Sequence, residues 1–163
     1  MRIIGTTTDR PAGTQLRAIQ FGYLGLVPFA FAALVVWLTP ALFTPAFMFS
    51  FVGWVLLYAA IILSFMGGAR WGAAIRDWRP DKLLMTTIPA LVAWLTVIPN
   101  GIAPGLYMDQ PTRFAVLMVA FVVLMFSELQ AKGEWAPWYR TLRLRLSLAT
   151  TAFLLLTVLG LMR

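Results

Sequence analysis

Five long apolar stretches dominate the chain and decide what it can fold into. A helix needs about 20 residues to cross a hydrocarbon core of about 30 Å, and each stretch is near that length. In lipid, every backbone N–H and C=O must be satisfied within the segment, which a helix achieves and an isolated strand does not. The sequence therefore predicts an all-α bundle of five transmembrane helices, over residues 19–38, 46–68, 83–99, 112–129 and 144–161.

The composition agrees with a lipid environment. Of the 163 residues, 61% are hydrophobic and 12% are charged, whereas soluble domains carry about 25% charged residues. The chain has no cysteine and no histidine, which excludes disulfides, thiolate metal sites and imidazole catalysis. We expect no metal and no cofactor. The net charge of +7 does not indicate a nucleic-acid partner, because no water-facing module gathers the basic residues.

The predicted spans are not equivalent. Pro28 and Pro89 fall inside the first and third spans and are expected to kink them. The first apolar run is too long for the core of a signal peptide, so we expect a retained helix after an N-terminal arm of residues 1–18. The fourth span is apolar for only about 15 residues before Ser127, which makes it the weakest prediction of the five.

The placement of basic residues predicts the orientation in the membrane. Short loops rich in lysine and arginine stay in the cytoplasm. The arm and the second and fourth loops hold eleven of the 13 basic residues, and the opposite side holds two, Arg113 and Arg163. The sequence predicts a cytoplasmic N-terminus and an external C-terminus. The eleven are Arg2, Arg10, Arg17, Arg70, Arg76, Arg79, Lys82, Lys132, Arg140, Arg143 and Arg145.

Small residues recur every fourth position at the end of the second span. Ala60, Ser64, Gly68 and Gly72 form one stripe on a helix. Such stripes let helix backbones approach closely, so the stripe predicts helix packing inside the bundle or between copies of the chain. A cradle for a ligand or a lipid headgroup is the alternative, because glycine also admits a bound group close to the backbone.

Arg70 and Glu128 form a candidate ion pair. Both lie near the cytoplasmic ends of their predicted spans, at similar heights in the membrane. An acidic side chain in lipid is costly and usually finds a partner. We therefore expect Glu128 to pair with Arg70, or else with Arg143 or Arg145 on the fifth span. Anchoring of both side chains at the interface is the alternative.

Aromatic and basic residues around the fifth span indicate an interfacial anchor. Tryptophan and tyrosine concentrate at the headgroup level, and arginine can meet anionic lipid phosphates there. Membrane lipids are therefore expected partners. The predicted interfacial residues are Trp71, Trp138, Tyr139, Arg143 and Arg145.

Two of these segments resemble a known family, the bacterial domain-of-unknown-function family 3429, which is similar to the mitochondrial transmembrane protein 69 group. The resemblance implies a small multi-pass protein of the bacterial inner membrane or of mitochondria, and it supplies no activity. The residues that carry it are Ile62–Phe65, Gly67–Gly68, Arg70–Gly72, Pro137–Tyr139 and Leu142–Arg143.

The sequence predicts a bacterial inner-membrane protein that acts by binding within the membrane. It would be a non-enzymatic accessory or assembly factor, or a small subunit, with other membrane proteins or a second copy as partners. A small oligomeric transporter or channel with Arg70 and Glu128 at its inner mouth is the alternative. A continuous polar path lined by Gln20, Ser64, Thr86 and Thr87 would favour it. A lipid enzyme is the third reading, and it would need Glu128, Asp77 or Asp81 to converge on one pocket.

Overall fold

The fold is all-α. The computed structural model describes residues 10–102, 105, 107–130 and 136–163, and the regular elements in these ranges are helices. Arg2 and Lys132, two of the basic residues that predict the orientation, lie outside the described residues. The helices are α1 (Arg10–Leu24), α2 (Val27–Leu38), α3 (Pro45–Arg76), α4 (Pro80–Val97), α5 (Gln110–Gln130) and α6 (Pro137–Leu161).

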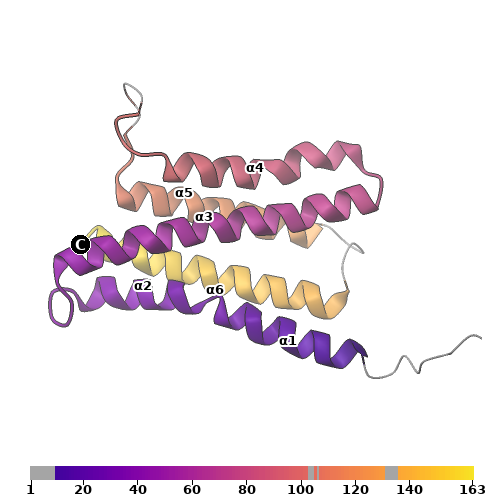
Figure 1. Ribbon diagram of the computed structural model, residues 1–163, viewed down its shortest axis with the longest axis horizontal. Helices are drawn as coiled ribbons and strands as arrows, with labels where there is room; N and C mark the ends of the chain where they lie inside the picture. Colours follow the sequence, from indigo (N-terminus) through magenta and orange to yellow (C-terminus); the bar gives the residue numbers. More distant parts are fainter. Residues whose placement is uncertain (1–9, 103–104, 106, 131–135) are drawn as a thin grey trace, which may run out of the picture.

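The helices lie side by side as an elongated bundle (Figure 1). α3 packs against α2, α4 and α5, and α6 packs against α1, α2 and α5. One end of the bundle carries the start of α1, the α3–α4 turn, the end of α5 and the start of α6. We call it the basic end, because the described members of the eleven basic residues lie on or beside these segments.

The first predicted span is two helices in line. α1 ends at Leu24 and α2 begins at Val27, with Pro28 in the first turn of α2. Proline is tolerated there because first-turn N–H groups have no partner within the helix. The predicted break is confirmed, and Tyr58 Oη donates to the Gly25 carbonyl at 3.0 Å beside it. Helix starts at Arg10, so residues 10–18 of the predicted arm are helical.

α3 is the longest element and begins with a capped first turn. The Thr44 hydroxyl accepts from the Phe47 N–H at 3.2 Å, and Pro45 occupies the first helical position. The helix has 32 residues, or about 48 Å at 1.5 Å per residue. This exceeds a hydrocarbon core of about 30 Å. The helix continues past residue 68, where the predicted span ends, to Arg76, which agrees with the expectation that this segment stays helical as far as Ile75.

The prediction of the weakest span was wrong. α5 meets the length and hydropathy that a crossing helix needs, although it carries Glu128. α4 does not, because its first turns hold charged and hydroxyl side chains, and it stays helical through Pro89. Four segments are long and apolar enough to cross a membrane: Gly13–Leu38, Pro45–Arg76, Gln110–Gln130 and Pro137–Leu161.

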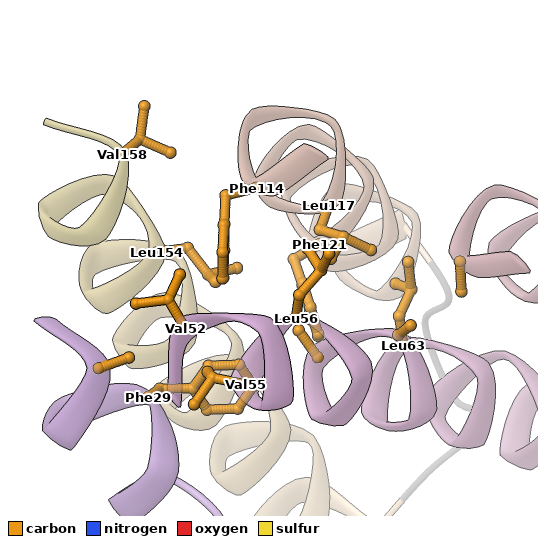
Figure 2. Packing of buried hydrophobic residues seen from close by; sticks show 14 of the residues in the cluster. Phe29, Val52, Val55, Leu56, Leu63, Phe114, Leu117, Phe121, Leu154 and Val158 are labelled. Carbon is orange, nitrogen blue, oxygen red and sulfur yellow. The ribbon is translucent and has the colours of Figure 1, made fainter. Parts of the chain in front are cut away.

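The core lies where α2, α3, α5 and α6 meet (Figure 2). Phe29 and Phe121 pack edge to face with ring centroids 6.4 Å apart, and Leu63 and Leu154 extend the cluster along the bundle. Large apolar side chains also cover the outside, and Trp54 is 78% exposed. An apolar exterior around an apolar core fits lipid as the solvent, since lipid tails are as apolar as leucine.

Candidate functional site

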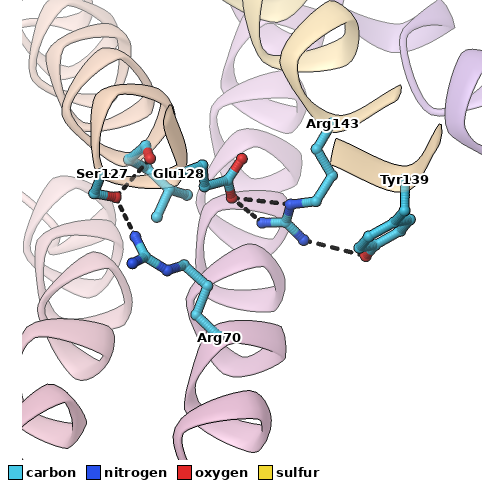
Figure 3. Close-up of polar contacts among 6 residues, drawn as sticks. Arg70, Ser127, Glu128, Tyr139 and Arg143 are labelled. Carbon is cyan, nitrogen blue, oxygen red and sulfur yellow. Dashed lines mark hydrogen bonds and ion pairs between the residues drawn. The ribbon is translucent and has the colours of Figure 1, made fainter. Parts of the chain in front are cut away.

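Glu128 and Arg143 form a buried ion pair near the basic end (Figure 3). Glu128 on α5 is 2% exposed, and Arg143 on α6 is 5% exposed. Arg143 Nε donates to Glu128 Oε1 at 2.9 Å, and Arg143 Nη2 donates to the same oxygen. The predicted Arg70–Glu128 pair is therefore wrong in its partner, and the alternative with Arg143 is confirmed.

Helix geometry explains the choice of partner. Consecutive residues point about 100° apart around a helix, so Ser127 and Glu128 face different neighbours. Arg70 reaches α5 from α3, and its Nη1 donates to the Ser127 hydroxyl (Figure 3). Arg143 reaches α5 from the adjacent helix of the α5–α6 hairpin. Arg70 therefore contacts Ser127, and Arg143 binds the carboxylate of Glu128.

The α6 segment that was predicted to meet lipid turns partly inward. Arg143 Nη1 donates to Tyr139 Oη at 3.3 Å, one helical turn away. Trp138 and Tyr139 are half-buried, whereas Arg145 and Trp71 are exposed. The predicted lipid contact of Arg143 is therefore wrong, because its guanidinium is buried against Glu128. Because Arg145 and Trp71 are exposed, their side chains stay available for contact with lipid headgroups at the membrane interface.

The small-residue stripe of α3 faces outward at its basic end. Ala60 is buried and Ser64 is half-buried, but Gly68 and Gly72 are exposed. A Cβ added at Gly68 or Gly72 would meet no atom within 4 Å. These two glycines therefore do not pack against a neighbouring helix among the described residues. Contact between copies of the chain, or with another protein, stays a prediction.

The glycine that permits close packing inside the bundle is Gly67, which the sequence reasoning missed. A Cβ at Gly67 would lie 3.0 Å from the Thr86 carbonyl oxygen and 3.2 Å from Pro89 Cβ. Gly67 therefore sets the approach of α3 to α4. The Gly67–Gly68 pair was a visible signal, but which glycine faces α4 depends on the rotation of the helix.

The half of the stripe that lies farther from the basic end lines a shallow groove between α3 and α4. The groove has a volume of about 330 Å³. Ala60 and Ser64 lie on its α3 side, and Ala90, Ala93 and Trp94 lie on its α4 side. Gly68 and Gly72 continue the same stripe beyond it. We call Ala60, Ser64, Gly68 and Gly72, together with this groove, the α3 outer face.

Arg113 forms a second buried site at the opposite end of the bundle, which the sequence reasoning also missed. The residue is 8% exposed. Its guanidinium donates to the Thr96 carbonyl at 2.7 Å, the Asn100 side-chain oxygen at 2.7 Å and the Met108 carbonyl at 2.9 Å. These bonds tie the end of α4 to the start of α5. An arginine one turn into an apolar span was the signal available.

The turn before α5 carries an acidic cap. Asp109 Oδ1 accepts from the Thr112 N–H at 3.1 Å. Hydrogen bonds from the Thr112 side chain and backbone hold the pKa of Asp109 below its ordinary value, because they stabilise the carboxylate. The cap adds to the Arg113 contacts and fixes where α5 starts.

The acidic residues of the lipid-enzyme reading lie in different surroundings. Glu128 is enclosed in the α5–α6 hairpin, whereas Asp77 pairs with Arg76 at 2.9 Å at the surface of the α3–α4 turn. Asp81 is exposed in the first turn of α4. Among the described residues, no group of three His, Cys, Asp or Glu side chains is placed to hold a metal ion.

Comparisons with known proteins agree with a membrane protein of uncharacterised activity. The chain is 34% identical over 132 residues to a Xenopus tropicalis protein named transmembrane protein 69. That match covers 77% of this chain and 47% of the relative, so the chain spans about half the length of this curated relative. No solved structure gives a significant match.

The family match covers almost the whole described bundle. The model of the family described as protein of unknown function, DUF3429, matches residues 14–159. These residues include the α3 segment and the α6 segment on which the resemblance was based. The chain is a multi-pass membrane protein that belongs to the DUF3429 family.

Proposed function

We propose that this protein is a non-enzymatic accessory or assembly factor, or a small subunit, of a membrane complex, and that it binds its partner through the α3 outer face. The observation that carries the proposal is that Gly68 and Gly72 are open to the outside while the helices of the bundle pack elsewhere. From Ser64 to Gly72 the accessible part of the face extends about 12 Å along α3. That length offers a partner helix about two turns of close contact.

Trp94, at the edge of the groove, supports the proposal that a partner binds to the α3 outer face. Trp94 is 61% exposed and lies beside Ser64 and Ala90 in the groove. Tryptophan is enriched at the energetic centres of interfaces, where it fills pockets on the partner. A transmembrane helix of another subunit, or α3 of a second copy, could lie along the small residues with Trp94 at its side.

The transporter alternative receives less support. The hydroxyls that would line a polar path donate to carbonyls of their own helices: Ser64 to Ala60, and Thr86 and Thr87 to Leu83. Glu128 is held by Arg143 in the interior of the α5–α6 hairpin. The Ser64, Thr86 and Thr87 hydroxyls and the Glu128 carboxylate therefore make their contacts within the folded bundle.

We also propose five crossings of the bacterial inner membrane, with a cytoplasmic N-terminus. α4 lies alongside α3 for most of its own length (Figure 1). A helix of 18 residues spans about 27 Å, close to a hydrocarbon core of about 30 Å. α4 would then cross the membrane in addition to the four more apolar segments, and α3 and α5 would shield it from lipid on two sides.

A pull-down from native membranes tests the proposal. The tagged wild-type chain, Gly68→Leu and Gly72→Leu would be purified in mild detergent, and co-purifying proteins would be measured by quantitative mass spectrometry. Phe126→Leu is the control, because Phe126 is exposed on α5, away from the α3 outer face. We expect a stoichiometric partner or a second copy with the wild type and the control, reduced at least tenfold by each glycine variant. Equal recovery with all four chains would refute the proposal.

A further inference from the structure

A second lateral cavity lies between α4 and α5 and is separate from the α3 outer face. Its volume is about 730 Å³, within the range of about 300–1,000 Å³ that is usual for ligand sites. Ile88 and Val92 of α4 and Val116 and Val123 of α5 are among its apolar walls. Its polar lining is sparse and includes Arg70. We call it the α4–α5 groove.

The groove is long enough for a lipid chain. Thr112 and Ser127 both line it, and they are 15 positions apart on α5, which is about 22 Å along a helix. One leaflet contributes about 15 Å to the hydrocarbon core. An acyl chain that starts at the basic end could therefore lie along the groove for the full depth of its leaflet.

The positively charged Arg70 lies at one end of this apolar groove. Arg70 is half-buried, and its hydrogen bond goes to the neutral hydroxyl of Ser127 (Figure 3). In the part of the chain that the structure describes, Arg70 Nε is buried without a hydrogen-bond partner. The nearby carboxylate of Glu128 is bound to Arg143, and Arg70 has no acidic partner among the described residues. A cation near membrane depth is costly unless an anion pairs with it.

The surroundings of Arg70 strengthen the attraction for an anion. Arg79 and Lys82 share a small cavity with Arg70 at the α3–α4 turn. Asp77, the acidic residue in that cavity, is paired with Arg76 and also interacts electrostatically with Arg79 and Lys82, so one carboxylate faces several basic side chains. Basic clusters at this depth attract anionic lipid headgroups, and a planar guanidinium matches the oxygens of a phosphate.

We propose that the α4–α5 groove binds one anionic phospholipid, with an acyl chain along α4 and α5 and the phosphate on Arg70. The apolar walls recognise the chain, and Arg70, supported by Arg79 and Lys82, recognises the charge. The site is independent of the partner surface proposed above, so either proposal can fail while the other stands.

Native mass spectrometry of the full chain in mild detergent tests this site. Phosphatidylglycerol and phosphatidylcholine of identical acyl chains would be added in equal amounts. We expect the wild type to retain one phosphatidylglycerol with a preference of about fivefold or more, the effect of one basic residue near an anionic headgroup. Arg70→Gln should reduce the preference to about one, and Arg70→Lys should retain most of it. Arg17→Gln removes an exposed charge on α1, outside the groove, and should leave the preference unchanged.

A second pair of variants tests the apolar half of the site. Val123→Trp fills the groove beside its charged end, and Phe126→Trp enlarges an exposed side chain of the same helix outside it. Val123→Trp should reduce the binding of both lipids at least fivefold, and Phe126→Trp should not. Equal binding of the two lipids by the wild type, equal effects of Arg70→Gln and Arg17→Gln, or full binding by Val123→Trp would overturn the proposal. If Arg70→Gln does not fold, Arg70→Lys and Val123→Trp still decide the outcome.

Discussion

At the scale of single residues, Glu128 and Arg143 depend on each other for their burial. Each is almost fully enclosed, and Glu128 Oε2 has no hydrogen-bond partner in the described part of the chain. Breaking such a pair leaves an uncompensated charge inside the protein, which costs about 3–5 kcal/mol. Replacing both partners with apolar residues removes both charges together and is often neutral.

The pair therefore predicts a rescue experiment. Glu128→Leu alone and Arg143→Met alone should each lower the free energy of unfolding by about 3–5 kcal/mol, and the double variant should recover most of the loss. Thermal unfolding in detergent measures this, with the exposed Arg145→Met as the control. A double variant no more stable than the worse single variant would contradict a direct pair.

Gly67 and Gly68 give a second prediction at the same scale. Gly67→Leu would force α3 and α4 apart, because even a Cβ there lies 3.0 Å from the Thr86 carbonyl oxygen. Overpacking of this kind costs about 1–3 kcal/mol. Gly68→Leu meets open space and should leave the unfolding midpoint of the purified monomer near that of the wild type. Equal losses in both variants would show that α3 is rotated from the orientation described.

At the scale of elements, the end of α3 is closed by a complete Schellman motif. The Arg79 N–H donates to the Ala74 carbonyl at 2.9 Å, and the Trp78 N–H donates to the Ile75 carbonyl at 3.1 Å. The motif places Trp78 in the left-handed region, at φ 51°, where glycine is usual. A residue with a Cβ pays about 1–2 kcal/mol there.

Substitutions at Trp78 separate the backbone from the side chain. Trp78→Gly should be more stable than Trp78→Ala by about 1 kcal/mol, because both lack the indole and only glycine avoids the left-handed strain. Unfolding midpoints of the two purified variants in the same detergent measure the difference. Equal midpoints would contradict the conformation given for the turn.

The elements also show how far the sequence could predict the fold. Apolar runs were sufficient to predict an all-α bundle with four helices long and apolar enough to cross a membrane, because lipid leaves the backbone little choice. The start of α6 was not predicted, since its helix begins in polar and aromatic residues at Pro137, seven positions before the apolar run. The span of α5 was underrated because its apolar run was counted only as far as Ser127, and the Arg143 that pairs with Glu128 becomes known only from the register of the α5–α6 hairpin.

The candidate site could be predicted only in part, because the sequence gives the height of a residue along a helix more closely than the direction in which its side chain points. Height in the membrane can be counted along a helix, so the sequence placed Glu128 near three arginines. Rotation about the helix axis cannot be counted as closely, and one residue amounts to about 100°. That rotation decides whether Arg70 meets Ser127 or Glu128, and whether Gly67 or Gly68 faces α4. Arg113 was missed because its partners are mainly backbone carbonyls.

At the scale of the whole molecule, the proposed five crossings place the two termini on opposite sides. An N-terminal green fluorescent protein should fluoresce in the cytoplasm, and a C-terminal alkaline phosphatase should be active outside it. The physical reason is the concentration of basic residues at the end of the bundle that holds the start of α1. An inactive C-terminal phosphatase that is expressed at normal levels would mean that α4 does not cross.

The central claim is that the α3 outer face binds a membrane protein. The chain has no cysteine, so Gly68→Cys introduces a single attachment point for a photoreactive group. Illumination in native membranes should link position 68 to one defined protein or to a second copy, and Gly72→Leu should abolish the product. Leu148→Cys, on an exposed part of α6, is the matched control and should yield none. If position 68 gives only the lipid adducts seen from position 148, the α3 outer face has no protein partner and the account is wrong.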